Sequence, residues 1–415
     1  MKIIIKLCFI VSALFLLSSL FSCDNNKPEG PADQANLNFP NDEYEVWFGG
    51  PEYYSKWSNG PASDPDYFPI AVWLQSPGNA IKYKNIGINL YIGLWEGPTE
   101  NQLGELNAAG MNVIADQNST ALNSQYNKII KGWSHQDEPD NAQPDGTGGY
   151  GPCISPGEIQ SLYNKMKTAD PSRPVYLNLG QGVANDEWPG RGSCSGQNDD
   201  YPEYIAGADI ISFDIYPAVS TRANVSGNLW LVALGVERLR QWADYSKPVW
   251  VWLETTHISN PDVRPTPHQI RAEVWMALIH GAMGIGYFAH EFEPSFIEAG
   301  LLAYSDITDA VLEINRQIQS LAPVLNSQTV INGVSVGSSN SAVPIAAMLK
   351  RYKNSTYLFT AAMRDAATTG TFTLTNMPET ATVVVLGEDR QLQITNGIVS
   401  DNFKGYDVHL YRIDH

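Results

Sequence analysis

The sequence predicts a (β/α)8 barrel, eight parallel strands alternating with helices, followed by a small antiparallel β-sandwich. Between about residues 69 and 325, eight short apolar runs alternate with helix-like stretches. Strands this uniformly apolar are typical of a parallel sheet that is covered on both faces. Eight such units in roughly 255 residues match the usual size of a closed barrel. An open doubly wound sheet is the alternative, but no Gly-rich nucleotide-binding loop follows the first run.

The barrel elements can be placed from apolar runs and helix signals. The strands are expected at residues 69–75, 88–94, 111–115, 129–133, 174–178, 208–216, 248–253 and 284–289, and the helices at 78–87, 99–109, 121–127, 156–169, 228–245, 267–282 and 306–324. Thr99 and Gln102 have the spacing of a capping box, and Gly110 ends that helix. Ser155 and Pro156 start another helix as N-cap and first helical residue.

After about residue 328 the helical stretches stop. Short strands separated by turns are expected at 357–363, 371–375, 382–386, 391–395 and 407–413. We therefore divide the chain into a (β/α)8 barrel over 44–326 and an Ig-like accessory β-sandwich over 327–415. The stretch 45–48 is a possible strand of either unit. Packing on the barrel is a more usual role for such a sandwich than binding a ligand.

The N-terminus has the features of a signal peptide over residues 1–22: a basic start, an apolar run too short to span a bilayer, and a processing site. Leu20-Phe21-Ser22-Cys23 resembles a bacterial lipobox. The resemblance implies that Cys23 carries a lipid and that the protein is exported and anchored to a bacterial membrane, the outer one. A plain secretory signal is the alternative. Residues 23–43 are polar and contain Pro and Gly, which is typical of a flexible tether.

The chain is strongly acidic, which bears on its partners. The formal net charge is −18, and it becomes −20 once Lys2 and Lys6 leave with the signal peptide. Such acidity disfavours nucleic acid, whose phosphates need clustered Lys and Arg.

Cys153 and Cys194 lie in Gly-rich loops, where a disulfide is expected and two free thiols are the alternative. His290, Glu291 and Glu293 fit no standard ligand set, and we expect no metal and no cofactor.

The stretch 132–140, Gly-Trp-Ser-His-Gln-Asp-Glu-Pro-Asp, ends the fourth predicted strand. Asp and Pro are rare inside strands, whereas charged residues at strand ends are typical of the active-site rim of a barrel. Glu138 is therefore our candidate catalytic carboxyl group. Glu254 ends the apolar seventh strand, nearly opposite the fourth, and is its candidate partner. Two carboxyls about 5–5.5 Å apart cleave a glycosidic bond with retention, one as acid and one as nucleophile.

This pattern resembles the clan A glycoside hydrolases, in which a Glu-Pro ends the fourth strand and a Glu ends the seventh. The resemblance implies that Glu138 is the acid/base, that Glu254 is the nucleophile and that Tyr216 holds the nucleophile. Asp137 departs from the pattern, because an Asn usually precedes the acid/base. A barrel with a short sandwich on a surface lipoprotein is also similar to the endo-β-1,3-glucanases of glycoside hydrolase family 158.

Further candidates lie at the same strand ends. His135 and His257 are expected to support the carboxyls together with Asp137 and Tyr216. The expected substrate contacts are Trp133, Trp188, Trp95, Asn178, Trp252 and His290, since aromatic faces suit the apolar face of a sugar ring.

The leading hypothesis is thus a retaining glycoside hydrolase, a monomer, that cleaves a β-linked polysaccharide such as a β-1,3-glucan. The long loops 141–157 and 182–203 come from the same rim and favour an endo-acting cleft. An exo-acting β-galactosidase-like or β-glucosidase-like enzyme and a non-catalytic glycan-binding lipoprotein are the alternatives. The sequence does not name the sugar or the linkage.

Overall fold

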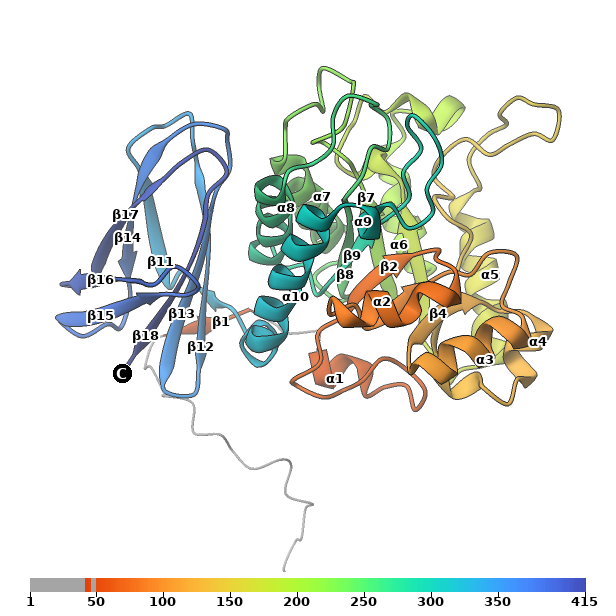
Figure 1. Ribbon diagram of the computed structural model, residues 1–415, viewed down its shortest axis with the longest axis horizontal. Coiled ribbons are helices and arrows are strands. Elements are labelled where there is room, and N and C mark those ends of the chain that lie inside the picture. Colours follow the sequence, from red (N-terminus) through yellow and green to blue (C-terminus); the bar gives the residue numbers. More distant parts are fainter. Residues whose placement is uncertain (1–41, 46–49) are drawn as a thin grey trace, which may run out of the picture.

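The structure is a computed structural model that describes residues 42–45 and 50–415. It has two parts side by side, a helix-covered barrel and an antiparallel β-sheet (Figure 1). The predicted signal peptide, Cys23, nearly all of the predicted tether and most of the possible strand at 45–48 lie outside the described residues.

The first part is a closed parallel barrel, as predicted. Its strands, in order, are β2 (Ile70–Trp73), β3 (Leu90–Ile92), β4 (Asn112–Asp116), β5 (Ile130–Ser134), β6 (Val175–Leu179), β7 (Ile210–Asp214), β8 (Val249–Glu254) and β9 (Gly284–Phe288). The pairing of Ile70 with Ile285 closes the ring between the first and last strands. Glu138 therefore follows the fourth barrel strand, and Glu254 ends the seventh.

Helices cover the outside of the barrel. They are α2 (Ala80–Asn85), α3 (Glu100–Ala109), α4 (Ser119–Asn123), α5 (Pro156–Ala169), α6 (Tyr201–Ala206), α7 (Trp230–Trp242), α8 (Pro267–Ile279), α9 (Gly300–Ala303) and α10 (Ser305–Leu325). The capping box of Thr99 and Gln102 forms as predicted, and Gly110 ends α3 in the left-handed conformation. The sequence did not predict α6, which is one and a half turns long and begins inside the stretch that we treated as a loop.

Large aromatic rings fill the inside of the barrel. Trp250 and Trp252 point inward from β8, and small residues on β9 make room for them. A Cβ atom at Gly286 would lie 2.2 Å from the Trp252 ring, so this position accepts only glycine. The N-terminal helix α1 (Gly50–Tyr54) closes the opposite end, where the Trp250 indole donates to the Tyr54 hydroxyl at 3.2 Å. The barrel stays open at the other end, where the carboxyl ends of its strands lie.

The second part is an antiparallel sheet of eight strands. In spatial order these are β11 (Val334–Ser338), β14 (Thr368–Leu374), β17 (Ile398–Phe403), β16 (Arg390–Thr395), β15 (Thr380–Val385), β18 (Val408–Asp414), β13 (Ser355–Ala362) and β12 (Ile345–Tyr352). The edge strands β11 and β12 approach each other, so the sheet curls around its own apolar core. The sequence prediction missed β11, β12 and β17. A separate pair, β1 (Glu43–Tyr44) and β10 (Val330–Ile331), joins the N-terminal segment to the connection between the two parts.

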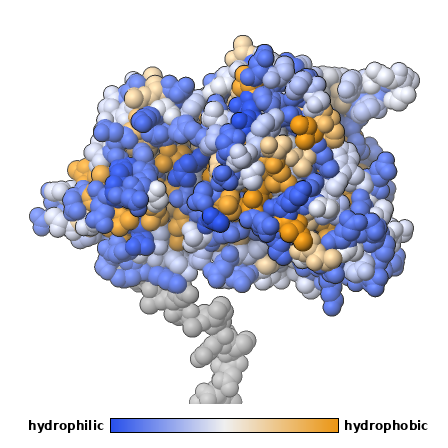
Figure 2. Space-filling view, in the orientation of Figure 1, coloured by the Kyte–Doolittle hydropathy of each residue, from blue (hydrophilic) through white to orange (hydrophobic). Residues whose placement is uncertain are grey.

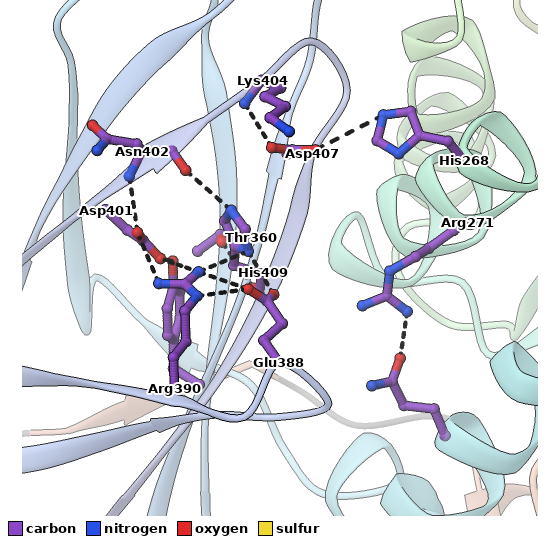
Figure 3. A network of polar contacts seen from close by, with 12 residues as sticks. His268, Arg271, Thr360, Glu388, Arg390, Asp401, Asn402, Lys404, Asp407 and His409 are labelled. Atoms are coloured by element: carbon purple, nitrogen blue, oxygen red, sulfur yellow. Dashed lines mark hydrogen bonds and ion pairs between the residues drawn. The ribbon is translucent and has the colours of Figure 1, made fainter.

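The sheet packs on the side of the barrel, against α8 and α10 (Figure 1). The ring of Trp275 on α8 lies 5.3 Å from that of Phe359 on β13, within one continuous buried cluster. Polar contacts flank this apolar interface, and His268 donates to the Gly405 carbonyl at 2.8 Å. Figure 3 shows the adjoining ion-pair network within the sheet, where Arg390 contacts both Glu388 and Asp401 at 2.7 Å. The sheet therefore stabilises the barrel from the side and leaves its mouth open.

Hydrophilic residues cover most of the face seen in Figure 2, and hydrophobic residues are grouped in patches between them. Within the described part of the chain, no helix has the length and apolar character needed to cross a bilayer.

Candidate active site

A pocket of about 440 Å³ opens at the carboxyl end of the barrel. This volume lies within the range of small-molecule binding sites. Six of the residues predicted from the sequence line it: Asp137, Glu138, Asn178, Trp188, Tyr216 and Trp252. Asp214, which ends β7, lines it as well. The pocket thus contains three carboxyl groups in an aromatic setting.

Glu138 is held in an unusual backbone conformation. Its φ angle is +41°, in the left-handed region that non-glycine residues seldom adopt and that costs about 1–3 kcal/mol. A Cβ atom at Gly180 would lie 2.9 Å from Glu138 Oε1, so glycine on the neighbouring strand end leaves room for the carboxyl group. Asn141 Nδ2 donates to Glu138 Oε2 at 2.8 Å, and Trp188 Nε1 donates to Asn141 Oδ1 at 2.8 Å. The last two contacts fix the side chain from the loops after β5 and β6.

The carboxyl groups of Glu138 and Asp214 are hydrogen-bonded to each other. Burial, together with the neighbouring charge of Asp214, raises the pKa of Glu138 well above its usual range. Burial raises the pKa of Asp214 to about 6, and the hydrogen bonds that it accepts from Glu138 and Tyr216 limit that rise. Of the two carboxyls, Asp214 therefore ionises first, and Glu138 is the one that keeps its proton to higher pH. This is the arrangement required of a general acid.

Asn178, at the end of β6, connects the other carboxyls. Its Nδ2 lies 3.0 Å from Asp137 Oδ1 and 3.4 Å from Asp214 Oδ1. The pKa of Asp137 is raised because the pocket walls shield it from water and because Asp214 lies nearby, although part of its side chain stays open to solvent. All three carboxyls therefore gather on one side of the pocket, at the ends of β5 and β7, with Asn178 of β6 between them.

The side formed by β8, β9 and β2 is aromatic. Trp73, Trp252 and Phe288 line it, and the rings of Trp73 and Trp252 meet edge to face at 5.0 Å. Phe292, 45% exposed, extends this side to the rim and lies 5.8 Å from the ring of Phe296, which is 55% exposed. Exposed rings that gather at a pocket mouth are typical of a ligand-binding surface.

The structure does not place Glu254 in the pocket. Its side chain is fully buried, and its two carboxylate oxygens accept the backbone N–H groups of Ala218 at 2.6 Å and Val219 at 2.9 Å. It also contacts the carboxyl group of Glu273 on α8. Burial raises the pKa of Glu254 to about 7 and that of Glu273 well above its usual range. The expected arrangement of Glu138 and Glu254 facing each other across the mouth is therefore wrong in this structure.

Two other predicted residues point away from the pocket. Trp133 is fully buried, and its indole donates to Asp170 at 3.2 Å, so its prediction as a sugar platform is wrong. The reason is strand alternation, since Trp133 points toward the helices and not toward the barrel axis. His135 is also buried, with Nε2 bonded to the Gly207 carbonyl at 2.8 Å, and does not line the pocket.

The remaining predicted residues lie outside the pocket wall. His290 is 3% exposed and donates to the Leu74 carbonyl at 2.9 Å. Trp95 is 41% exposed and stacks over His290, with its indole donating to Glu298 at 2.9 Å. His257 Nδ1 lies 3.1 Å from the Asn260 carbonyl. These contacts order the loops that follow β3, β8 and β9. None of the three residues lines the pocket, so their role is to hold the loops around it.

Cys153 and Cys194 form a disulfide between the two rim loops. The bond joins the loop that carries Asn141 to the loop that carries Trp188, and these two residues hold Glu138. The loop between β5 and α5 projects from the barrel in Figure 1.

A larger cavity of about 1090 Å³ lies between the barrel and the sheet, bordered by Arg271, Glu388 and Asp407. Its acidic and basic residues are interspersed, and it is remote from the strand ends, so we place the active site in the smaller pocket. Over residues 42–45 and 50–415, no group of three or more His, Cys, Asp or Glu side chains is arranged to hold a metal ion.

No protein-family model matches the chain, and no curated protein matches its sequence. Among solved structures, the chain is similar to an α-amylase from Geobacillus thermoleovorans, with a TM-score of 0.51, 11% identity, and coverage of 85% of this chain and 99% of that one. At this identity the likeness establishes the barrel fold alone.

Two further solved structures are similar at lower scores. A family 30 endoxylanase from Clostridium papyrosolvens has a TM-score of 0.48 with 11% identity, covering 90% of this chain and 98% of that one. A putative α-galactosidase from Bacteroides fragilis has 0.46 with 8% identity, covering 84% and 80%. All three names are those of glycoside hydrolases. Membership of clan A or of family 158 stays a prediction from the sequence.

Proposed function

We propose that this protein is a glycoside hydrolase and that Glu138 donates the proton to the departing glycosidic oxygen. The observation that carries the proposal is that Glu138 and Asp214 lie side by side in the pocket at the barrel mouth, where burial and the neighbouring carboxylate raise the pKa of Glu138. Glycoside cleavage needs a carboxylic acid that is still protonated near neutral pH, and burial beside a second carboxyl group provides it.

The wall opposite Glu138 supports a saccharide as the ligand. Trp73, Trp252 and Phe288 offer apolar faces there, and on the carboxyl side Asn178 and Gln181 add amide groups. A sugar ring has an apolar face and a rim of hydroxyls, and this combination of aromatic and convergent polar groups suits both. A β-linked glycan is the substrate class expected from the sequence.

The decisive experiment compares the wild type with Glu138→Gln on a panel of β-glucans, galactans, mannans and polymers of N-acetylglucosamine. We expect the wild type to release reducing ends from one class and the variant to bind that glycan without cleaving it. Binding by both proteins without cleavage by either would support a glycan-binding protein instead. A ladder of products would support the endo-acting β-glucanase predicted from the sequence, and monomer alone would support an exo-acting enzyme.

Export and lipid anchoring through Cys23 are part of the same proposal. The lipobox-like ending of residues 20–23 supports them. Incorporation of labelled palmitate into the full chain, lost in Cys23→Ala, tests the anchor. A secreted, unlabelled wild-type protein would contradict it.

A further inference from the structure

The source of the nucleophile is the open question in this pocket. Retaining glycosidases place two carboxyls about 5–5.5 Å apart, and inverting ones about 6.5–9.5 Å apart, so that the anomeric carbon lies between them. Glu138 and Asp214 are instead directly hydrogen-bonded, which leaves no room for a sugar carbon between them. Asn178 bridges Asp137 to Asp214 on the same side.

The opposite side offers no replacement carboxylate. Among the described residues that line the pocket there, the side chains are aromatic, aliphatic or hydroxyl-bearing, apart from Arg222. Glu254 is buried behind the backbone of Ala218 and Val219. The Tyr216 hydroxyl donates a hydrogen bond to Asp214, and burial raises the pKa of Tyr216 well above its usual range, so it is not a ready nucleophile.

We propose that the substrate supplies the nucleophile, as the carbonyl oxygen of an acetamido group on C2, and that the natural substrates are β-linked 2-acetamido-2-deoxyhexosides. This inference rests on the proposed glycosidase function and names its substrate class. It differs from the β-1,3-glucan expected from the sequence, because glucose carries no acetamido group.

The reaction then needs one acid and one charge-stabilising carboxylate. Glu138 gives its proton to the glycosidic oxygen, the bond from that oxygen to the anomeric carbon breaks, and the amide oxygen bonds to that carbon from the opposite face. The product is a bicyclic oxazolinium ion, whose N–H is hydrogen-bonded to ionised Asp214. Glu138, now a carboxylate, takes a proton from water as the water oxygen attacks the anomeric carbon. The bond between the amide oxygen and the anomeric carbon breaks, which opens the oxazolinium ring and restores the acetamido group. The proton taken from water restores the acid form of Glu138.

The pocket suits an acetamido group in two respects. Asp214 is 8% exposed and is oriented by Asn178 and the Tyr216 hydroxyl, so it presents a fixed acceptor for an amide N–H. The neighbouring ring of Trp252, packed edge to face on Trp73, gives an apolar surface for the methyl group. Asp214 thus acts on the substrate directly, while Tyr216 is a positioning residue.

The test uses aryl β-glycosides that differ only at C2 and are hydrolysed by the full-length protein. We expect cleavage of the 2-acetamido glycoside and at least about a tenfold lower kcat/KM when the acetyl group is replaced by trifluoroacetyl, because fluorine withdraws electrons from the attacking oxygen. A thiazoline analogue of the oxazolinium ion should inhibit competitively. Its affinity should fall in Asp214→Asn and stay unchanged in Asp309→Asn, an exposed control on α10.

Equal rates for the acetyl and trifluoroacetyl substrates would overturn the inference. So would Glu138-dependent cleavage of glucosides with no cleavage of the acetamido series, which would leave the proposed glycosidase function intact. A glycosyl azide formed by Asp214→Ala in the presence of azide would identify Asp214 as a protein nucleophile and would also overturn it. Cleavage of no glycoside at all would overturn the proposed function and this inference together.

Discussion

Glu138 and Asp214 share a hydrogen bond between their carboxyl groups across the gap between the fourth and sixth barrel strands. Asp214 lies near the end of the predicted strand at 208–216, but it is not among the site residues predicted from the sequence. The contact makes Glu138 a proton donor and makes Asp214 the anion that keeps it protonated.

This pair predicts a bell-shaped dependence of kcat/KM on pH. Activity should rise as Asp214 ionises around its pKa of about 6 and fall at higher pH as Glu138, whose pKa is raised, loses its proton. In Asp214→Asn the negative charge that raises the pKa of Glu138 is gone, so the alkaline limb should move to lower pH. An alkaline limb that stays in place in this variant would contradict the assignment.

Glu254→Gln should keep most of the activity. Glutamine can accept one of the two backbone N–H groups that Glu254 accepts, so the loop carrying Ser220, Thr221 and Arg222 should loosen. We expect a higher KM, a kcat within about tenfold of the wild type, and no acceleration by azide. A loss of about 10⁴-fold in kcat with rescue of Glu254→Ala by azide would instead establish Glu254 as the nucleophile, as the resemblance to clan A implies.

The buried pair of Glu254 and Glu273 predicts that stability falls with rising pH. The Glu273 carboxyl accepts no hydrogen bond from the donors in the described part of the chain and contacts Glu254 instead. Both groups have a usual pKa of 4.5; the folded state raises the pKa of Glu254 to about 7 and raises that of Glu273 well above 4.5. The folded protein therefore binds more protons than the unfolded one in this range, and the free energy of unfolding decreases as pH rises from about 4.5 through 7.

Glu273→Gln should flatten that decrease and raise the melting temperature near pH 8, because its amide is uncharged and can donate to Glu254. Thermal unfolding monitored by circular dichroism between pH 5 and 9 measures both effects. Glu313→Gln, at an exposed position of α10, is the matched control and should leave the slope unchanged. A variant slope equal to that of the wild type would show that the pair does not titrate in this range.

Loss of the disulfide should affect stability and the pocket together. Replacing Cys153 and Cys194 with Ser should lower the free energy of unfolding by about 2–4 kcal/mol. KM should also rise, because Asn141 and Trp188 lie on the two loops that the bond joins. Reducing agent should reproduce the effect in the wild type and leave the double variant unaffected. An unchanged KM would show that the loops hold Glu138 without the bond.

The barrel could be predicted because its strands are apolar on both faces and its helices carry clear caps, as at Thr99 and Ser155. The strands β11, β12 and β17 were missed because their sequences mix small, polar and charged residues, and pairing with neighbours defines them. The side chain of Glu138 was placed correctly at a strand end. The direction of the Glu254 side chain could not be predicted. It turns away from the pocket, toward the backbone of Ala218 and toward α8.

Asp214 could have been found from alternation alone. Counting back from it in steps of two along β7 gives Ser212 and Ile210, which face the barrel interior, so Asp214 and then Tyr216 point to the mouth. Counting along β5 in the same way places Trp133 on the outer face, toward the helices. Ile130 breaks this alternation, because it packs in the same outer cluster and the register between β4 and β5 shifts next to it. That shift is a property of pairing that the sequence does not reveal.

The most direct test of the account is the effect of Glu138→Gln on two substrates with different leaving groups. We expect kcat/KM for the natural glycan to fall by about 10²–10⁴-fold, because its alkoxide leaving group needs the proton. The rate for a dinitrophenyl glycoside of the same sugar should stay close to that of the wild type, because that leaving group departs without protonation. An equal loss on both substrates, or no loss on the natural glycan, would contradict the role of Glu138 as the acid.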